Sequence, residues 1–247
     1  MPFTPSHAAL VLPLVRINSR YLSATGLIVG SMVPDFEYFF RMSPHGEFGH
    51  TLPGLVLFDL PVSVALAFIF HGVVKQRFIS HLPVFLQTRL QPLRQCDFVT
   101  YFKNNPLIFI VSALLGAGSH IFWDDFTHGD GYFVEHLAFY NHRYVPFEGV
   151  RYPLWYALQN ISSYAGLAIV IIYILCIKPE VRGEVHAPAL WYWCFVMLVA
   201  LLVVGVRFEF DLAGARLGEL IVASISGLCI AVVLAGVMPF RAASGYS

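Results

Sequence analysis

The chain has 247 residues, of which 57% are hydrophobic and only 12% are charged, and its formal net charge is zero. An average soluble domain carries about 25% charged residues, so this composition predicts a helical bundle in lipid rather than a soluble core. The charge balance gives no sign of a nucleic-acid partner, and we expect none. No basic residue precedes the first apolar stretch, so we expect no cleavable signal peptide.

The first 51 residues contain two apolar runs, at residues 8–15 and 21–33. A helix needs about 20 apolar residues to cross the bilayer core, so runs of this length favour short interfacial or re-entrant helices. Gly26 and Gly30 would allow one of these helices to pack closely against another. An alternative is that residues 21–40 form a sixth, kinked span.

Five later stretches are long and apolar enough to cross a membrane, namely residues 52–74, 106–123, 152–177, 189–206 and 217–238. The sequence therefore predicts an all-α protein, a polytopic transmembrane bundle of about five spans that forms a single membrane domain over residues 1–247. Within it, the polar residues concentrate in the spans of residues 52–177, whereas residues 189–238 form two anchoring spans. Gln159 lies near the start of the third span, on a face expected to turn toward the protein interior.

The loop at residues 75–105 contains five basic residues and one acidic residue. The positive-inside rule places such a loop in the cytoplasm. Alternation then puts the N-terminal segment and residues 124–151 on the outer side, and the C-terminus in the cytoplasm.

Histidines and carboxylates cluster in the first half of the chain. His120 and Asp124 are spaced by four residues and would share one face of a helix. His50 opens the first span and this pair closes the second, so the two groups can meet at one membrane face. Imidazole and carboxylate are the usual ligands of zinc, manganese and iron where thiolates are absent. The expected metal ligands are His7, Asp35, His50, His120 and Asp124.

Three further side chains are expected to support these ligands. Asp59 lies about two turns into the first span, where an ionisable group is costly and needs a partner. Thr127 and Asp125 follow the second span directly. Hydrogen bonds from such neighbours orient metal ligands. For a lone histidine elsewhere, such as His71 or His136, an ordinary hydrogen-bonding role is the better interpretation.

Five motifs carry a family resemblance, and together they span most of the chain. They are MPFT-x-SH at residues 1–7, GSMVPDFEYF at 30–39, HT-x-x-G at 50–54 followed by FDLP at 58–61, SH-x-x-x-D-x-x-T at 119–127, and Q-x-x-SS-x-x-G at 159–166. They resemble a family of bacterial integral membrane proteins known as domain of unknown function 4184. The resemblance implies a multi-pass protein of the bacterial inner membrane.

The same order of motifs is more distantly similar to the inner-membrane metal-dependent hydrolase family. His45 and His50 match that family's first histidine motif, but Gly46 and Gly49 stand where it has arginine and threonine. Thr51 likewise replaces its serine. This resemblance implies a metal site and hydrolysis.

Three functions fit these features. The first is a metal-dependent hydrolase in which zinc or manganese activates water at the outer membrane face. There His128, Glu37 and His45 would serve as catalytic proton-transfer groups. Its partners would be membrane lipids, and its substrate a lipid-linked or phosphate ester. The alternatives are a non-catalytic scaffold with a structural His/Asp cluster, and a transporter or channel. The sequence leaves the substrate, the number of ions and the oligomeric state open.

Overall fold

The computed structural model describes residues 3–15, 20–180, 190–209 and 216–240. Residue 189, where the fourth span was expected to begin, and the end of the chain after residue 240 lie outside these ranges. The chain forms two compact units, each built from three separate segments. The first contains Met1–Asp35, Phe48–Ser63 and Asn105–Tyr173, and the second contains Phe36–Glu47, Val64–Asn104 and Ile174–Ser247.

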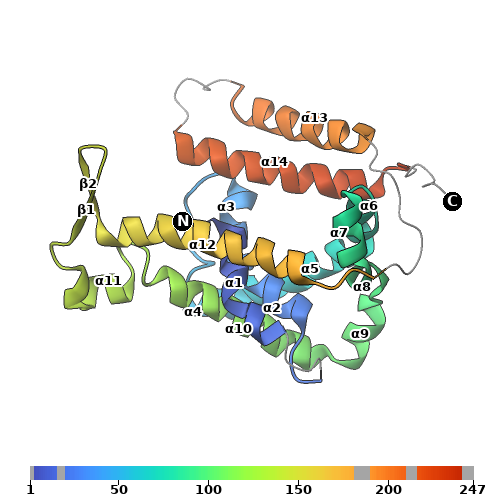
Figure 1. Cartoon of the computed structure of the whole chain (residues 1–247), viewed down its shortest axis with the longest axis horizontal. Coiled ribbons are helices and arrows are strands. Elements are labelled where there is room, and N and C mark those ends of the chain that lie inside the picture. Colours follow the sequence, from blue (N-terminus) through green and yellow to red (C-terminus); the bar gives the residue numbers. More distant parts are fainter. Residues whose placement is uncertain (1–2, 16–19, 181–189, 210–215, 241–247) are drawn as a thin grey trace. The chain divides into compact units, whose positions relative to one another are not determined.

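The first unit contains most of the polar motifs, and Figure 1 labels its α-helices and strands. Its elements are α1 (Thr4–Val15), α2 (Ala24–Gly30), η1 (Val33–Asp35), α4 (Leu52–Gly54), η2 (Leu55–Asp59), α10 (Pro106–Asp124), α11 (Tyr132–His136), η4 (Ala138–Tyr140), β1 (Tyr144–Phe147) and β2 (Val150–Pro153). The two strands pair antiparallel as a hairpin, with Phe147 opposite Val150. Two helices pass from the first unit into the second, α5 (Leu60–Ile69) and α12 (Leu154–Cys176).

The second unit contains the remaining elements. They are α3 (Phe36–Arg41), η3 (Phe70–Val74), α6 (Lys75–Ser80), α7 (Val84–Arg89), α8 (Gln91–Gln95), α9 (Phe98–Asn104), α13 (Leu190–Arg207) and α14 (Leu217–Val237). Helices α13 and α14 lie side by side (Figure 1), and their shared core includes Tyr192, Val196 and Ala231. Gly227 lets α14 come close to the carbonyl of Ala200 on α13, 2.9 Å from where a Cβ would stand.

The all-α membrane fold is confirmed. Among the described residues, five helices are long and apolar enough to cross a membrane, namely Leu52–Ser80, Pro106–Asp124, Leu154–Cys176, Leu190–Arg207 and Leu217–Val237. The first is longer than predicted, because the helix runs on through residues 75–80. It also widens into π-helical turns at Leu55–Asp59 and Phe70–Val74. The first of these lies next to Pro61, which lacks the N–H that a regular helix would use.

The N-terminal segment forms short helices, as predicted. Residues 21–40 divide into α2, η1 and α3, separated by a turn after Gly30, instead of forming a sixth span. Thr4–Val15 is an apolar helix of 12 residues, too short to cross the bilayer.

Helix α2 packs closely against α10, and glycines on both helices make this possible. A Cβ at Gly30 would stand 2.2 Å from the carbonyl oxygen of Ala113, and one at Gly116 would stand 2.4 Å from that of Leu27. The contact predicted for Gly26 and Gly30 is therefore confirmed. Because the helices touch backbone to backbone, the carbonyl groups at the end of α2 reach side chains on α10.

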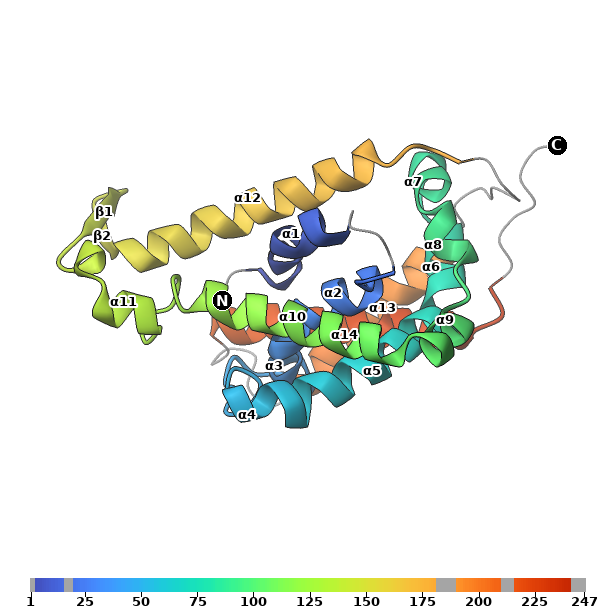
Figure 2. The ribbon, with the colours of Figure 1, turned by 90° about the horizontal axis from the view of Figure 1, so that it is seen from below.

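Helix α1 lies between α10 and α12 (Figure 2). Two hydrogen bonds tie its start to α12, from the Ser6 hydroxyl to the Ser163 carbonyl at 2.7 Å and from the Phe3 N–H to the Ser163 hydroxyl at 3.0 Å. Gly166 allows this approach, since a Cβ there would stand 2.7 Å from the Ser6 carbonyl. Ser163 and Gly166 of the 159–166 motif therefore hold α1 in place.

Candidate metal centre

The first unit brings together the five predicted metal ligands. His7 comes from α1, Asp35 from η1, His50 from the turn before α4, and His120 and Asp124 from the last turns of α10. The buried face of α10 explains the last pair, since Ser112, Gly116, His120 and Asp124 recur every four residues along it. Four of the five residues are buried, and His50 is about a quarter exposed, with 24% of its side chain accessible.

Four N···O distances in this cluster lie in the range found between neighbouring ligands of one ion, and His50, His120 and Asp124 form one group with ligand atoms within 4.8 Å of one another. His50 Nε2 lies 3.5 Å from both Asp35 Oδ1 and Asp124 Oδ2. His120 Nε2 lies 3.6 Å from the same oxygen of Asp35 and 3.4 Å from the same oxygen of Asp124. N–H···O hydrogen bonds are shorter, roughly 2.7–3.2 Å. Four ligands about 2.0–2.2 Å from one zinc ion, placed tetrahedrally, lie roughly 3.3–3.6 Å apart.

His7 lies against this group on its other side. Its ring stacks on that of His120, with the centroids 3.6 Å apart. Its Nε2 lies 3.5 Å from Asp124 Oδ1, the carboxylate oxygen that does not face His50 and His120. Neither ring nitrogen of His7 has a hydrogen-bond partner among the described residues. His7, Asp35 and His120 also form a group with ligand atoms within 4.8 Å of one another.

Backbone and side-chain groups orient two of the ligands. His120 Nδ1 donates a hydrogen bond to the Ser31 carbonyl at 2.8 Å, which directs Nε2 at the carboxylates and makes Nε2 the free nitrogen of the neutral ring. The Thr4 hydroxyl donates to Asp35 Oδ2 at 2.5 Å, so that Oδ1 faces the histidines. Such second contacts fix the orientation of metal ligands.

The surroundings set the charges of the ligands that lie outside the spans. Burial, followed by the effect of His120, lowers the pKa of His7 to about 3, so that its imidazole is neutral near pH 7. Burial raises the pKa of Asp35, but His120 beside it outweighs this and leaves the pKa below the ordinary value. Burial lowers the pKa of His50, whereas the carboxylates of Asp124 and Asp35 raise it and prevail. Protons therefore bind to this site in the absence of an ion, and a metal ion would compete with them for His50.

His128 lies beside the cluster and keeps one nitrogen basic. Its Nδ1 donates to the Asp124 carbonyl at 3.1 Å and lies 3.7 Å from Asp124 Oδ1. Its Nε2 lies 3.2 Å from the amide nitrogen of Gln159, which can only donate, so this Nε2 accepts. Burial lowers the pKa of His128. Of the three predicted proton-transfer residues, His128 is placed next to the predicted metal ligands.

Glu37 and His45 belong to the second unit, where each has polar neighbours of its own. Glu37 is buried, forms an ion pair with Arg41 at 3.0 Å and accepts the N–H of Glu47 at 2.9 Å. His45 is exposed, and its Nδ1 lies 3.0 Å from the Ser43 hydroxyl. Glu37 is thus engaged in stabilising the end of α3, and a catalytic role for either residue stays a prediction.

The predicted supporting residues differ in what they contact. Thr127 is buried, and its hydroxyl donates to the Trp123 carbonyl at 3.3 Å. Asp125 ends α10 and accepts the Tyr132 N–H at 3.4 Å, so it orders the following loop. Asp59 is fully buried in the π-helical turn, and its support of the ligands stays a prediction.

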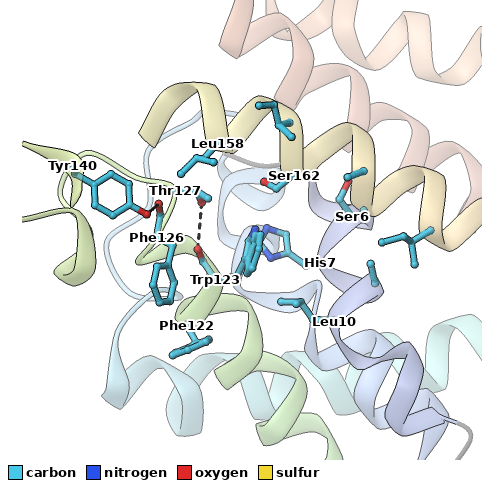
Figure 3. A pocket seen from close by; sticks show the side chains of 15 residues that line it. Ser6, His7, Leu10, Phe122, Trp123, Phe126, Thr127, Tyr140, Leu158 and Ser162 are labelled. Carbon is cyan, nitrogen blue, oxygen red and sulfur yellow. Dashed lines mark hydrogen bonds between the residues drawn. The ribbon is translucent and has the colours of Figure 1, made fainter. Parts of the chain in front are cut away.

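An apolar cavity of about 580 Å³ adjoins the cluster, and His7 forms part of its wall. Figure 3 shows His7 reaching from α1 into the space between α10 and α12. No sequence pattern indicated this cavity, because its wall comes from three helices and the segment after α10. The contacts of Thr4 with Asp35 and of Gln159 with His128 were also not predicted, although both residues stand within the recognised motifs. The contact of His120 with Ser31 uses a backbone carbonyl, which every residue type has, so the sequence cannot indicate it.

The fold and the cluster define a class, a multi-pass membrane protein in which buried histidines and aspartates gather at the end of a spanning helix. Residues 1–237 match the model of the family described as domain of unknown function (DUF4184), and the chain belongs to that family. No curated protein and no solved structure matches it. The more distant likeness to the inner-membrane metal-dependent hydrolases has no support from these comparisons and stays a hypothesis.

Proposed function

We propose that this protein is a membrane-embedded metal-dependent hydrolase whose divalent ion is held by Asp35, His50, His120 and Asp124. The observation that carries the proposal is the set of four N···O distances between 3.4 and 3.6 Å. They are too long for good hydrogen bonds and match four of the six edges of a tetrahedron around zinc. An octahedral manganese site would need shorter separations, so zinc is the favoured ion and manganese the alternative.

The residues around the ligands support a catalytic rather than a purely structural site. When bound, the ion would polarise a phosphoryl or acyl oxygen and make water a better nucleophile. His128 holds an accepting nitrogen next to Asp124 and can take up or return a proton. The neutral imidazole of His7 offers a further ligand or a contact to the reacting group. A purely structural metal site does not require an adjoining cavity, so the cavity beside His7 favours a catalytic site.

The proposed location is the bacterial inner membrane, with the cluster at the outer face and the C-terminus in the cytoplasm. Five spanning helices support a multi-pass arrangement. The basic loop of residues 75–105 supports the orientation through the positive-inside rule. The proposed substrate is a phosphate ester or lipid-linked ester of the membrane.

The first experiment measures metal. We expect the full-length protein, purified in detergent, to contain about one zinc per chain by mass spectrometry. The double variant His120→Ala/Asp124→Ala should lose it. His136→Ala is the matched control, because His136 is exposed and bonded to the Tyr132 carbonyl on its own helix. Equal metal content in the double variant and the wild type would refute the metal site.

The second experiment separates a hydrolase from a scaffold. Hydrolysis of p-nitrophenyl phosphate by the zinc-loaded protein should fall roughly 10²–10⁴-fold in His128→Gln, the range usual for loss of a general acid or base. The metal content should stay at one ion, because His128 is not among the four ligands. Full metal occupancy without hydrolysis of this or any lipid ester would favour the structural cluster instead.

A further inference from the structure

The cavity beside His7 has a wall that is almost entirely apolar. Residues of α1, α10, α12 and the loop after α10 line it, among them Leu10, Phe122, Phe126, Leu158, Ala165 and Ile169. Its volume of about 580 Å³ lies within the range of sites that bind small organic molecules. A cavity of this character suits a hydrocarbon group better than a water-soluble metabolite.

The hydroxyl groups in the wall are already engaged. Ser6 donates to the Ser163 carbonyl at 2.7 Å, Ser162 to the Gln159 carbonyl at 3.0 Å, and Tyr140 to the Phe126 carbonyl at 2.8 Å. None of these donors is left for a ligand. His7 differs, because its side chain is fully buried while neither of its nitrogens has a hydrogen-bond partner among the described residues. His7, which points into the cavity (Figure 3), therefore offers polar recognition on the side where the wall adjoins Asp124 and His120.

The rim of the cavity is apolar and accessible. Leu10, Phe122, Ile161 and Ile169 are between 39% and 62% exposed. Phe122 lies on α10, and Ile161 and Ile169 on α12, both of which are candidate membrane spans. On such helices exposed apolar side chains face lipid, so the cavity opens toward the bilayer.

We propose that this cavity holds the hydrocarbon chain of a membrane amphiphile, with the head group at His7 and the His/Asp cluster. This inference rests on the proposed hydrolase function and names its substrate class. A chain entering from the bilayer exchanges one apolar environment for another at little cost. Transfer of the same chain into water is unfavourable, because each methylene lowers the partition coefficient into water by a factor of about four. A lateral opening thus lets the head group reach the cluster while the chain stays out of water.

The test uses hexadecyl phosphate with a photoactivatable diazirine near the chain end. The probe is irradiated with the full-length, zinc-loaded protein in phosphatidylcholine nanodiscs, and the labelled peptides are mapped by mass spectrometry. Labelling should concentrate on the cavity-lining peptides of α1 and α12. Unlabelled hexadecyl phosphate should suppress it at least tenfold, and butyl phosphate should not. Labelling spread over the exposed faces of α13 and α14, or insensitive to the competitor, would overturn the proposal.

A matched pair of substitutions tests the cavity itself. Ala165→Trp places a large ring within the cavity, whereas Ala168→Trp places the same ring on an exposed position of α12 outside the lining. Cavity labelling should fall at least tenfold in the first variant and stay unchanged in the second. Ile161→Trp, at the rim, serves if Ala165→Trp does not fold, as judged by gel filtration. Undiminished labelling in a folded cavity variant would overturn the proposal.

The two proposals fail in different ways. Crosslinking requires neither an ion nor turnover, so cavity labelling in a protein that binds neither zinc nor manganese would refute the hydrolase and leave the chain-binding cavity. Stoichiometric zinc and hydrolysis of p-nitrophenyl phosphate without specific labelling would refute the amphiphile and leave the metal site.

Discussion

The glycine contact between α2 and α10 gives a quantitative prediction about the metal centre. In Gly116→Ala, the new Cβ would stand 2.4 Å from the Leu27 carbonyl oxygen and 2.7 Å from the Ser31 nitrogen, whereas ordinary contacts begin at 3.4 Å. Both neighbours are backbone atoms, so α2 must move by about 1.0 Å, the difference between 3.4 and 2.4 Å. We expect this strain to cost about 1–3 kcal/mol, as overpacking of a core usually does.

The same movement should weaken metal binding. The His120 Nδ1···Ser31 carbonyl distance is 2.8 Å, and a shift of about 1 Å would take it beyond hydrogen-bonding range. Loss of such a contact to a ligand histidine typically lowers metal affinity about 10–100-fold. The assay is zinc competition against a chromogenic chelator with the purified protein in detergent, combined with thermal unfolding.

Gly118→Ala is the matched control for this prediction. Gly118 lies on the same helix, but a Cβ there would meet nothing within 4 Å. Replacing it should leave zinc affinity unchanged and should stabilise the helix by up to about 1 kcal/mol. If both variants behave alike, or if Gly116→Ala binds zinc as the wild type does, the close packing of α2 does not position His120.

Three further predictions concern the ligands. Thr4→Val removes the hydroxyl that donates to Asp35 and should lower zinc affinity about 10–100-fold. The control Thr100→Val removes a similar hydrogen bond to the exposed Asp97 and should leave zinc affinity unchanged. Equal effects of the two substitutions would contradict the role of Thr4. Zinc affinity should be highest at high pH and fall on acidification, because a protonated imidazole cannot bind the ion. The carboxylates raise the pKa of His50 above its ordinary 6.5, so the decline should begin above pH 6.5; equilibrium dialysis between pH 5 and 9 measures it, and a flat profile would exclude His50 as a ligand. Removing zinc with a chelator should lower the unfolding temperature. Free zinc at 100 times its dissociation constant should then raise the free energy of unfolding by about 2.7 kcal/mol. The stability of the His120→Ala/Asp124→Ala double variant should respond neither to the chelator nor to zinc.

The sequence determined the membrane fold and predicted the residues of the proposed site. Five long apolar stretches sufficed for the spans, because the length of a helix that crosses lipid is set by bilayer thickness. The four-residue spacing of His120 and Asp124 sufficed to place both on one helix face, because that spacing follows from the helical period. The meeting of His7, Asp35 and His50 with this pair was predicted from the expected topology, and the distances agree with it.

Tertiary structure alone decided how the ligands are held and what adjoins them. The orientation of His120 depends on the Ser31 carbonyl, which every residue type would offer, so only the approach of α2 to α10 reveals it. The cavity depends on how α1, α10 and α12 diverge around His7, which no local pattern encodes. Local periodicity fixes which side chains share a helix face, whereas distances between helices depend on packing between segments far apart in sequence.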